Sequence, residues 1–180
     1  LPLPREVRKW AVQRIAGSPL FCCVRYTLSV PSLDFFIGKG GVGKTTMSSA
    51  YAACMAAQRR GRVLLLSTDP AHSLFDIFGL RAGRERQRVK ISDKAALDVW
   101  QLDAAREFSQ FLGEYRDAVL DVIASGTIFS REEVAPLLDS AIPGMAEVSA
   151  LLVLAGLIHS REYDRIVVDT APLGHTLRLF

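Results

Sequence analysis

One segment constrains the fold of this chain more than any other: residues 38–45, which read Gly-Lys-Gly-Gly-Val-Gly-Lys-Thr. They match the phosphate-binding pattern G-x-x-x-x-G-K-[ST] at every fixed position. Glycines allow a tight turn that points backbone N–H groups at an anion, and a following helix adds the positive end of its dipole. A strand-like apolar run over 33–37 enters the loop and a helical pattern leaves it. The segment therefore predicts a nucleoside triphosphate site, rather than a glycine-rich turn with a chance lysine.

The loop also predicts which residues contact the nucleotide. In such a loop the lysine reaches the β- and γ-phosphates, and the hydroxyl after it helps to hold Mg²⁺. These positions are Lys44 and Thr45. The predicted nucleotide-binding residues are Gly38, Lys39, Gly40, Gly41, Val42, Gly43, Lys44, Thr45 and Thr46. ATP and Mg²⁺ are the predicted ligands.

The rest of the chain predicts an α/β fold. We expect strands over 63–67, 97–102 and 165–169, and helices over 46–60, 104–123 and 145–160. The strands over 63–67 and 165–169 are continuous apolar runs, as in parallel strands covered on both faces. This order indicates a P-loop NTPase with a mainly parallel sheet flanked by helices, incomplete in this chain. Residues 33–180 form the predicted ATPase domain, with a helical insertion at about 104–160.

Three segments outside the motifs have structural predictions of their own. Met47, Tyr51, Cys54 and Met55 keep helical spacing in the first helix, and Cys54 is expected in the core. The apolar helix over 145–160 is expected to be buried against the sheet, because it is too short to span a bilayer. The Arg-rich run over 81–90 is expected to be a solvated loop.

Composition narrows the classes of partner. The 180 residues are 49% hydrophobic with a net charge of +3, which is too small to indicate nucleic acid binding. Three cysteines without a C-x-x-C pattern favour reduced thiols in a cytoplasmic protein. No apolar run reaches the roughly 18 residues that a membrane span needs. Residues 1–32 are expected to be a peripheral extension, although a signal peptide is conceivable, and the chain is expected to be a fragment.

Two acids lie at the ends of apolar strands. Asp169 follows the run Ile-Val-Val, as a Mg²⁺-associated Walker B element requires. Asp69 follows the strand over 63–67 and is placed to orient a water at the γ-phosphate. Read alone, Asp69 could instead be a turn acid or helix cap before Pro70. The predicted metal site comprises Thr45, Asp69 and Asp169, the aspartates acting through water.

Three motifs together resemble the ArsA family of P-loop ATPases, which includes arsenite-pump ATPases and Get-pathway ATPases for tail-anchored proteins. The loop carries a second lysine, Lys39, as in the deviant loops that this family shares with MinD and ParA. Residues 67–74 (Ser-Thr-Asp-Pro-Ala-His-Ser-Leu) resemble switch I, and residues 169–178 (Asp-Thr-Ala-Pro-Leu-Gly-His-Thr-Leu-Arg) resemble switch II. Residues 142–145 are similar to a shorter family segment.

The resemblance implies the mechanism of an ATP hydrolase that works as a homodimer. The catalytic residues it implies are Asp69, which activates water, Lys44, and Lys39, which reaches the partner's nucleotide. An ordinary solvated lysine is the other reading of Lys39. Residues 169–175 would sense the γ-phosphate and move. His72 and His175 have the family's positions, and as isolated residues they read as structural histidines.

The resemblance leaves the client open. It is a hydrophobic tail segment or membrane protein, or else a membrane anion pump, and cysteines like those that bind arsenite are absent from the aligned part. Two other classes stay open: a nucleotide-gated binding module without appreciable turnover, and a MinD/ParA-like partitioning ATPase.

Overall fold

The computed structural model describes residues 11–13, 21–27, 31–58, 61–69, 73–81, 86–138 and 144–170. The strands are β1 (Ala11–Gln13), β2 (Phe21–Thr27), β3 (Ser32–Gly38), β4 (Val63–Ser67), β5 (Gln87–Ser92), β6 (Ala95–Gln101) and β7 (Arg165–Asp169). The helices are α1 (Lys44–Ala57), α2 (Ser73–Phe78), α3 (Ala104–Gly126), α4 (Arg131–Leu138) and α5 (Met145–Ser160).

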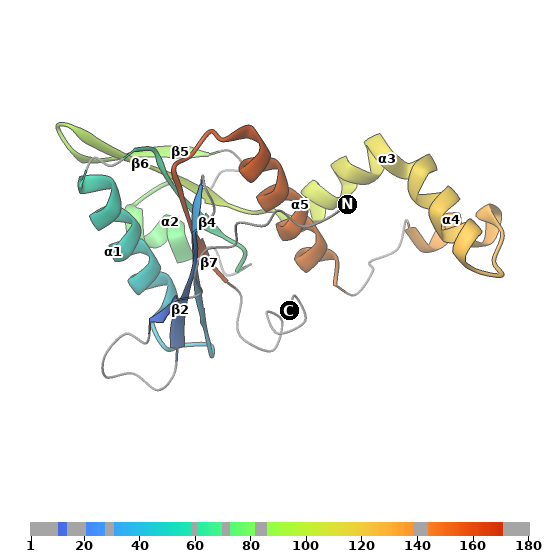
Figure 1. Cartoon of the computed structure of the whole chain (residues 1–180), viewed down its shortest axis with the longest axis horizontal. Coiled ribbons are helices and arrows are strands. Elements are labelled where there is room, and N and C mark those ends of the chain that lie inside the picture. Colours follow the sequence, from blue (N-terminus) through green and yellow to red (C-terminus); the bar gives the residue numbers. More distant parts are fainter. Residues whose placement is uncertain are drawn as a thin grey trace.

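The strands form one sheet in the order β1-β2-β3-β7-β4-β6-β5. The four central strands β3, β7, β4 and β6 pair in parallel with one another, in that order. At the edges β5 pairs antiparallel with β6, and β2 and β1 continue antiparallel beyond β3. Helices lie on both faces, with α1 on one side and α5 on the other (Figure 1). The predicted parallel α/β sheet is therefore confirmed.

The central strands are apolar on both faces because a helix covers each face. In β4, Val63 and Leu65 lie in the core with α1, whereas Leu64 and Leu66 lie in the core with α5. The same alternation holds in β7, where Val167 belongs to the α1 side and its two neighbours to the α5 side. A continuous apolar run is the pattern expected for such doubly covered strands.

Helix α1 packs on the sheet through small side chains, which corrects the predicted face. Its buried residues are Lys44, Ser48, Ser49, Ala52 and Ala56. Tyr51 and Met55 pack at the margin of this core, while Met47 is 37% exposed and Cys54 is exposed. The prediction of a core Cys54 is wrong. Small residues let the helix approach the sheet closely, so the larger side chains are displaced to its flanks.

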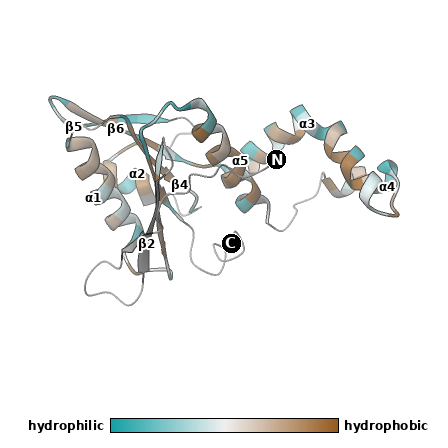
Figure 2. Cartoon of the chain, in the orientation of Figure 1, coloured by the Kyte–Doolittle hydropathy of each residue, from teal (hydrophilic) through white to brown (hydrophobic). Residues whose placement is uncertain are grey.

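Helix α5 has the predicted bounds but is buried on one face only. Ala150, Leu154 and Leu157 pack against the sheet. Val148, Leu151 and Leu152 are exposed on the helix, and Figure 2 shows its strongly apolar colouring. The prediction that this helix is buried against the sheet is therefore confirmed for one face only, and the other face is exposed.

The α3–α4 pair projects away from the sheet (Figure 1). Helix α3 begins with Asp103 as its cap, whose carboxylate accepts a hydrogen bond from the Arg106 N–H at 3.1 Å. Its far half packs on α4 in a separate small core that includes Leu120 and Val134. The predicted helix over 104–123 is confirmed and runs three residues further, whereas α4 was not predicted.

Three edge strands were missed. The Arg-rich run predicted as a loop partly forms β5, in which half-buried Val89 and Ile91 alternate with exposed Arg88 and Lys90. Charged side chains on the outer face suit an edge strand, because they oppose pairing with another chain. Strands β1 and β2 lie within the N-terminal segment, and β2 pairs with β3 along its whole length.

Candidate functional site

The four parallel strands end at the same edge of the sheet, where the last residues of β7, β4 and β6 form a continuous row with Phe36 of β3. Phe36 pairs with Asp169, Asp169 with Ser67, and Ser67 with Gln101. Phe36 packs in the core beside α1, and each of the other three lies two residues beyond a residue of its strand that does so. Side chains two residues apart in a strand point to the same face. The row therefore lies on the face that carries the glycine-rich loop. This is the edge at which open α/β sheets bind their ligands.

The glycine-rich loop joins β3 to α1 at this edge. Gly41 and Gly43 have φ angles of 74° and 83°, which residues with a Cβ adopt rarely. A Cβ on either glycine would meet no atom within 4 Å, so backbone conformation rather than space requires glycine there. Helix α1 begins directly afterwards and has no acidic residue in its first turn. Its N-terminal N–H groups can therefore face an anion without carboxylate repulsion.

The loop contains two lysines, Lys39 near its start and Lys44 near its end. The Lys44 side chain is 5% exposed, and its ammonium donates to the Lys39 carbonyl oxygen at 3.2 Å. Lys39 itself is exposed, as is Gly40. The positive charge of Lys44 thus lies within the loop, whereas that of Lys39 faces solvent.

Asp169 is fully buried beneath the loop. Its Oδ2 accepts a hydrogen bond from the Ser67 hydroxyl at 3.3 Å, and its Oδ1 has no hydrogen-bond partner among the described residues. Burial raises the pKa of the Asp169 carboxyl above its usual range, and the charge of Asp69 adds to this. A hydrogen bond from Thr45 and the charge of Lys44 act in the opposite direction. Thr45 and Asp69 are among the groups that act on Asp169, so the three predicted Mg²⁺ residues lie near one another.

Asp69 lies two residues beyond the end of β4. Its N–H donates to the Ser67 hydroxyl at 3.2 Å, and its carbonyl oxygen accepts a hydrogen bond from the Gln101 side-chain amide. The residues that follow it, 70–72, lie outside the described residues, as do 142–143 and 171–178. The predicted structural or sensing roles of His72 and His175 therefore fall outside the described part of the chain.

Three polar residues of this edge had no individual role predicted from the sequence, although Ser67 and Thr170 lie within the two motifs that resemble switches. Ser67 contacts both predicted aspartates, and Gln101 contacts Asp69. The Thr170 hydroxyl and N–H both donate to the Phe36 carbonyl, at 2.8 and 3.3 Å, which joins β7 to the end of β3. A usable signal existed, because each is a polar residue at the end of an apolar strand.

The donor set fits a nucleotide-bound Mg²⁺. Mg²⁺ prefers oxygen ligands and keeps several waters, and it is bound through one or two protein oxygens plus phosphates. Thr45 offers a hydroxyl, and Asp169 offers a buried carboxylate oxygen that has no other partner among the described residues. Over the described ranges, no group of three or more His, Cys, Asp or Glu residues could hold a metal by itself. A site shared with phosphate oxygens is consistent with both observations.

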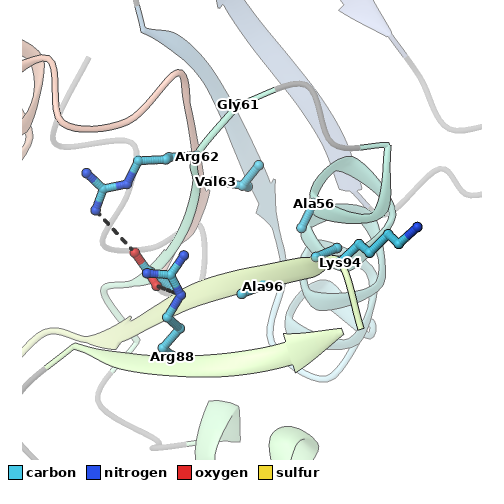
Figure 3. Close-up of a pocket in the computed structure, with 9 residues that line it drawn as sticks. Ala56, Gly61, Arg62, Val63, Arg88, Lys94 and Ala96 are labelled. Carbon is cyan, nitrogen blue, oxygen red and sulfur yellow. Dashed lines mark ion pairs between the residues drawn. The ribbon is translucent and has the colours of Figure 1, made fainter. Parts of the chain in front are cut away.

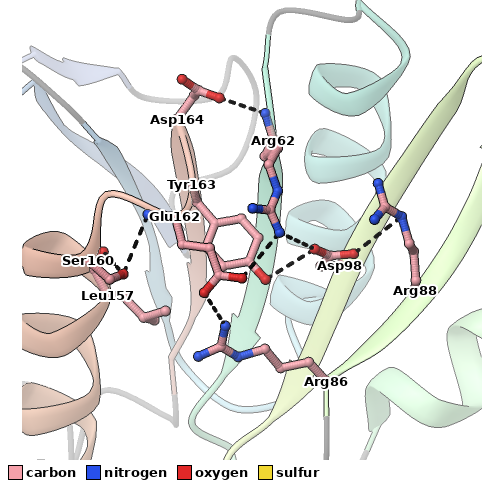
Figure 4. Close-up of polar contacts among 9 residues, drawn as sticks. All are labelled: Arg62, Arg86, Arg88, Asp98, Leu157, Ser160, Glu162, Tyr163 and Asp164. Atoms are coloured by element: carbon pink, nitrogen blue, oxygen red, sulfur yellow. Dashed lines mark hydrogen bonds and ion pairs between the residues drawn. The ribbon is translucent and has the colours of Figure 1, made fainter.

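Two other polar features lie at the opposite, amino-terminal edge of the strands. A cavity of about 280 Å³ is lined by Ala56, Gly61, Arg62, Val63, Arg88, Lys94, Ala95, Ala96 and Asp98 (Figure 3). Beside it, the hydrogen bond from Arg86 lowers the pKa of Glu162, and Tyr163 donates to Asp98 at 3.1 Å (Figure 4). Neither feature includes a residue of the glycine-rich loop.

Comparison with known proteins decides the family. Residues 33–180 match the family described as anion-transporting ATPase (ArsA). The chain belongs to the anion-transporting ATPase family. It is 44% identical over 153 residues to a protein named arsenical pump-driving ATPase 2 in Aquifex aeolicus, and 39% identical over 143 residues to the ATPase GET3 of Malassezia globosa. It is 35% identical over 158 residues to an arsenical pump-driving ATPase of Escherichia coli.

The chain spans less than half the length of these relatives of the anion-transporting ATPase family. The matches cover 81%, 78% and 87% of this chain but 47%, 39% and 26% of the three relatives. The matched region of the family includes the loop, both aspartates and the α3–α5 helices. None of the helices in the described part of this family member is long and apolar enough to cross a bilayer.

Proposed function

We propose that this chain is the nucleotide-binding part of an ATP-hydrolysing enzyme. The observation that carries the proposal is the row at the carboxyl edge, where buried Asp169 lies beneath Lys44 and Thr45 and next to Asp69. Residues 33–180 form the ATPase domain, and the 104–160 region is a helical insertion within it. Relatives that carry the name ATPase over the same region support this assignment.

The roles follow from the positions. Backbone N–H groups of residues 38–46 hold the phosphates, and Lys44 supplies positive charge to the β- and γ-phosphates. Thr45, Asp69 and Asp169 would hold Mg²⁺, and the ion would supply positive charge that neutralises charge on the phosphoryl group. Asp69 orients the attacking water. Phosphoryl transfer needs chiefly such positioning and charge stabilisation, so no covalent intermediate is required.

We further propose that the protein works in the cytoplasm as a dimer that closes on ATP and opens after hydrolysis. Exposed Lys39 is available to reach the nucleotide of a second copy. The membrane-directed task is the targeting of hydrophobic tail segments or the driving of an anion pump. The names of the relatives support both, since one group is named for arsenical pumps and another is GET3.

Two substitutions in the full-length natural protein test the enzyme assignment. Asp69→Asn should retain ATP binding and lower kcat by about 10²-fold or more, because it removes the water-orienting carboxylate. Lys44→Ala should weaken ATP binding by roughly 10- to 100-fold, as expected for lost charge-assisted hydrogen bonds. ATP affinity is measured by titration with a fluorescent nucleotide, and turnover by phosphate release. Lys90→Ala, an exposed lysine on β5, is the matched control.

The results separate the open classes. Undiminished turnover in Asp69→Asn would remove Asp69 from the mechanism, and normal affinity in Lys44→Ala would refute the loop assignment. ATP binding with no turnover in the wild-type protein would favour a nucleotide-gated binding module. Dimerisation is tested with Lys39→Ala, in which light scattering should show a weakened ATP-dependent dimer. A normal dimer would leave Lys39 as a solvated lysine.

The client is tested by co-expression with a tail-anchored helix. A soluble complex that dissociates in an ATP-dependent way would establish the targeting function. Intact ATPase activity without such a complex would favour an anion pump or another membrane partner. ATP-dependent binding to DNA or to bare vesicles would instead indicate a MinD/ParA-like ATPase.

A further inference from the structure

Gln101, a residue that neither the loop nor the switch motifs contain, contacts the backbone of Asp69. It is the last residue of β6 and is 3% exposed. Its side-chain Nε2 donates to the Asp69 carbonyl oxygen. In the sheet it pairs with Ser67, which hydrogen-bonds both Asp69 and Asp169. Gln101 therefore belongs to the row at the carboxyl edge, at the end of the row furthest from β3.

We propose that Gln101 is a positioning residue for ATP hydrolysis, because it fixes the backbone that carries the Asp69 carboxylate. The inference rests on the proposed function, in which Asp69 orients the attacking water. Gln101 itself contacts neither nucleotide nor water in this mechanism. It acts through Asp69.

Side-chain hydrogen bonds hold both the N–H and the carbonyl oxygen of Asp69. The Ser67 hydroxyl accepts from its N–H at 3.2 Å, and Gln101 donates to its carbonyl. Since Asp69 lies beyond the end of β4, strand pairing does not hold it. The side chains of Ser67 and Gln101, from two adjacent parallel strands, hold it instead. Displacing a reacting group by about 1 Å can cost on the order of 100-fold in rate. Loss of either hydrogen bond to the Asp69 backbone should therefore lower turnover.

Gln101 is itself held rigidly. Its strand pairs in parallel with β4, and the next residue, Leu102, donates its N–H to the Ser67 carbonyl at 2.9 Å. Asp103 then caps α3. The amide is thus presented from a fixed strand end, which is the support that a precise site requires.

The acceptor determines the orientation of the Gln101 amide. The opposite orientation would bring Oε1 against the Asp69 carbonyl oxygen, which cannot donate a hydrogen bond. Gln101 Oε1 is buried and has no hydrogen-bond partner among the described residues, so the contact with Asp69 is made through Nε2.

The test uses Gln101→Glu and Gln101→Leu in the full-length natural protein. Leucine removes the donor, and we expect kcat to fall about 10- to 100-fold while ATP affinity stays within about threefold. Glutamate keeps the shape but, when ionised, offers only acceptors to the Asp69 carbonyl oxygen. We therefore expect the kcat of Gln101→Glu to fall at least as far as that of Gln101→Leu, again with ATP affinity within about threefold of wild type.

Gln87→Glu is the matched control. Gln87 also donates its amide to a backbone carbonyl, that of Arg81 at 2.9 Å, but it lies on the edge strand β5. Its kcat and its ATP affinity should both stay near the wild-type values. Circular dichroism and thermal unfolding of each variant separate lost turnover from lost folding, and Gln101→Glu preserves the side-chain shape that Gln101→Leu changes.

The outcomes are distinct. Absence of hydrolysis by the wild-type protein would refute the proposed function. A wild-type ATPase whose Gln101 variants keep normal kcat would overturn the inference while leaving that function intact. A loss confined to ATP affinity would overturn it as well, as would an equal fall of kcat in Gln87→Glu. A fall of kcat in both Gln101 variants, with ATP affinity and folding retained, supports it.

Discussion

Replacing Asp169 with asparagine should stabilise the nucleotide-free protein and destabilise the Mg–ATP complex relative to wild type. In the free protein the carboxylate is fully buried, accepts hydrogen bonds from Ser67 and Thr45, and has no partner for Oδ1 among the described residues. Asparagine has the same shape and no charge. It therefore removes the cost of burying an incompletely paired carboxylate.

The magnitude follows from the charge at that position. A buried group without a partner costs about 1–3 kcal/mol when it is neutral and more when it is charged. The asparagine amide is also buried and loses the attraction of Lys44, so we expect a net gain of about 1–2 kcal/mol. For a chain of this size, 1 kcal/mol shifts Tm by about 2–4 °C, which predicts a rise of about 2–8 °C without ligand.

Ligand should reverse the order of stability. A ligand at 100 times its Kd stabilises the folded state by about 2.7 kcal/mol. Wild type should gain this stabilisation from Mg–ATP, whereas Asp169→Asn should gain much less because it holds Mg²⁺ poorly. Differential scanning fluorimetry with and without Mg–ATP measures both effects. Asp93→Asn, which alters a 91% exposed carboxylate on the β5–β6 turn, is the control and should change neither.

The sign of the pH dependence is also determined. Since burial raises the pKa of Asp169, the folded state binds this proton more tightly than the unfolded chain does. Wild type therefore loses stability relative to the variant as the pH rises from about 3.9, the ordinary aspartate pKa, through the raised value. The advantage of asparagine should be largest at neutral pH and smallest in acid. A variant that is less stable than wild type at pH 8 without ligand would refute this reasoning.

Two further substitutions test the loop and the core. Gly43→Ala forces a Cβ onto a φ of 83° at the start of α1, which should cost about 1–2 kcal/mol and weaken ATP binding, whereas Gly113→Ala within α3 should stabilise by up to about 1 kcal/mol. Denaturant unfolding and nucleotide titration measure these effects, and normal binding by Gly43→Ala would contradict the required loop geometry. Leu157→Ala empties a buried position against the sheet and should cost about 2–5 kcal/mol, whereas Leu151→Ala, at a position 50% exposed on the same helix, should cost little. Equal losses for the two leucines would show that both faces of α5 are covered in solution.

Much of the architecture could be predicted because its signals are local. The glycine-rich loop defines the end of one strand and the start of a helix, and β4 and α5 have the predicted bounds. Edge strand β5 could not be recognised, since its outward charges mask a weak apolar alternation. The packing face of α1 was misassigned because serine and alanine, rather than the larger apolar residues, contact the sheet.

The nucleotide loop, the fold class and the family motifs could thus be recognised from local sequence, because each depends on residues that are close together in the chain. That Phe36, Asp169, Ser67 and Gln101 form one row is visible only in the three-dimensional structure. These residues are brought together by the strand order β3-β7-β4-β6, which no local pattern specifies. The polar partners of the two aspartates follow from that order. The contact between Gln101 and Asp69 thus exists because parallel pairing aligns strand ends that are distant in the sequence.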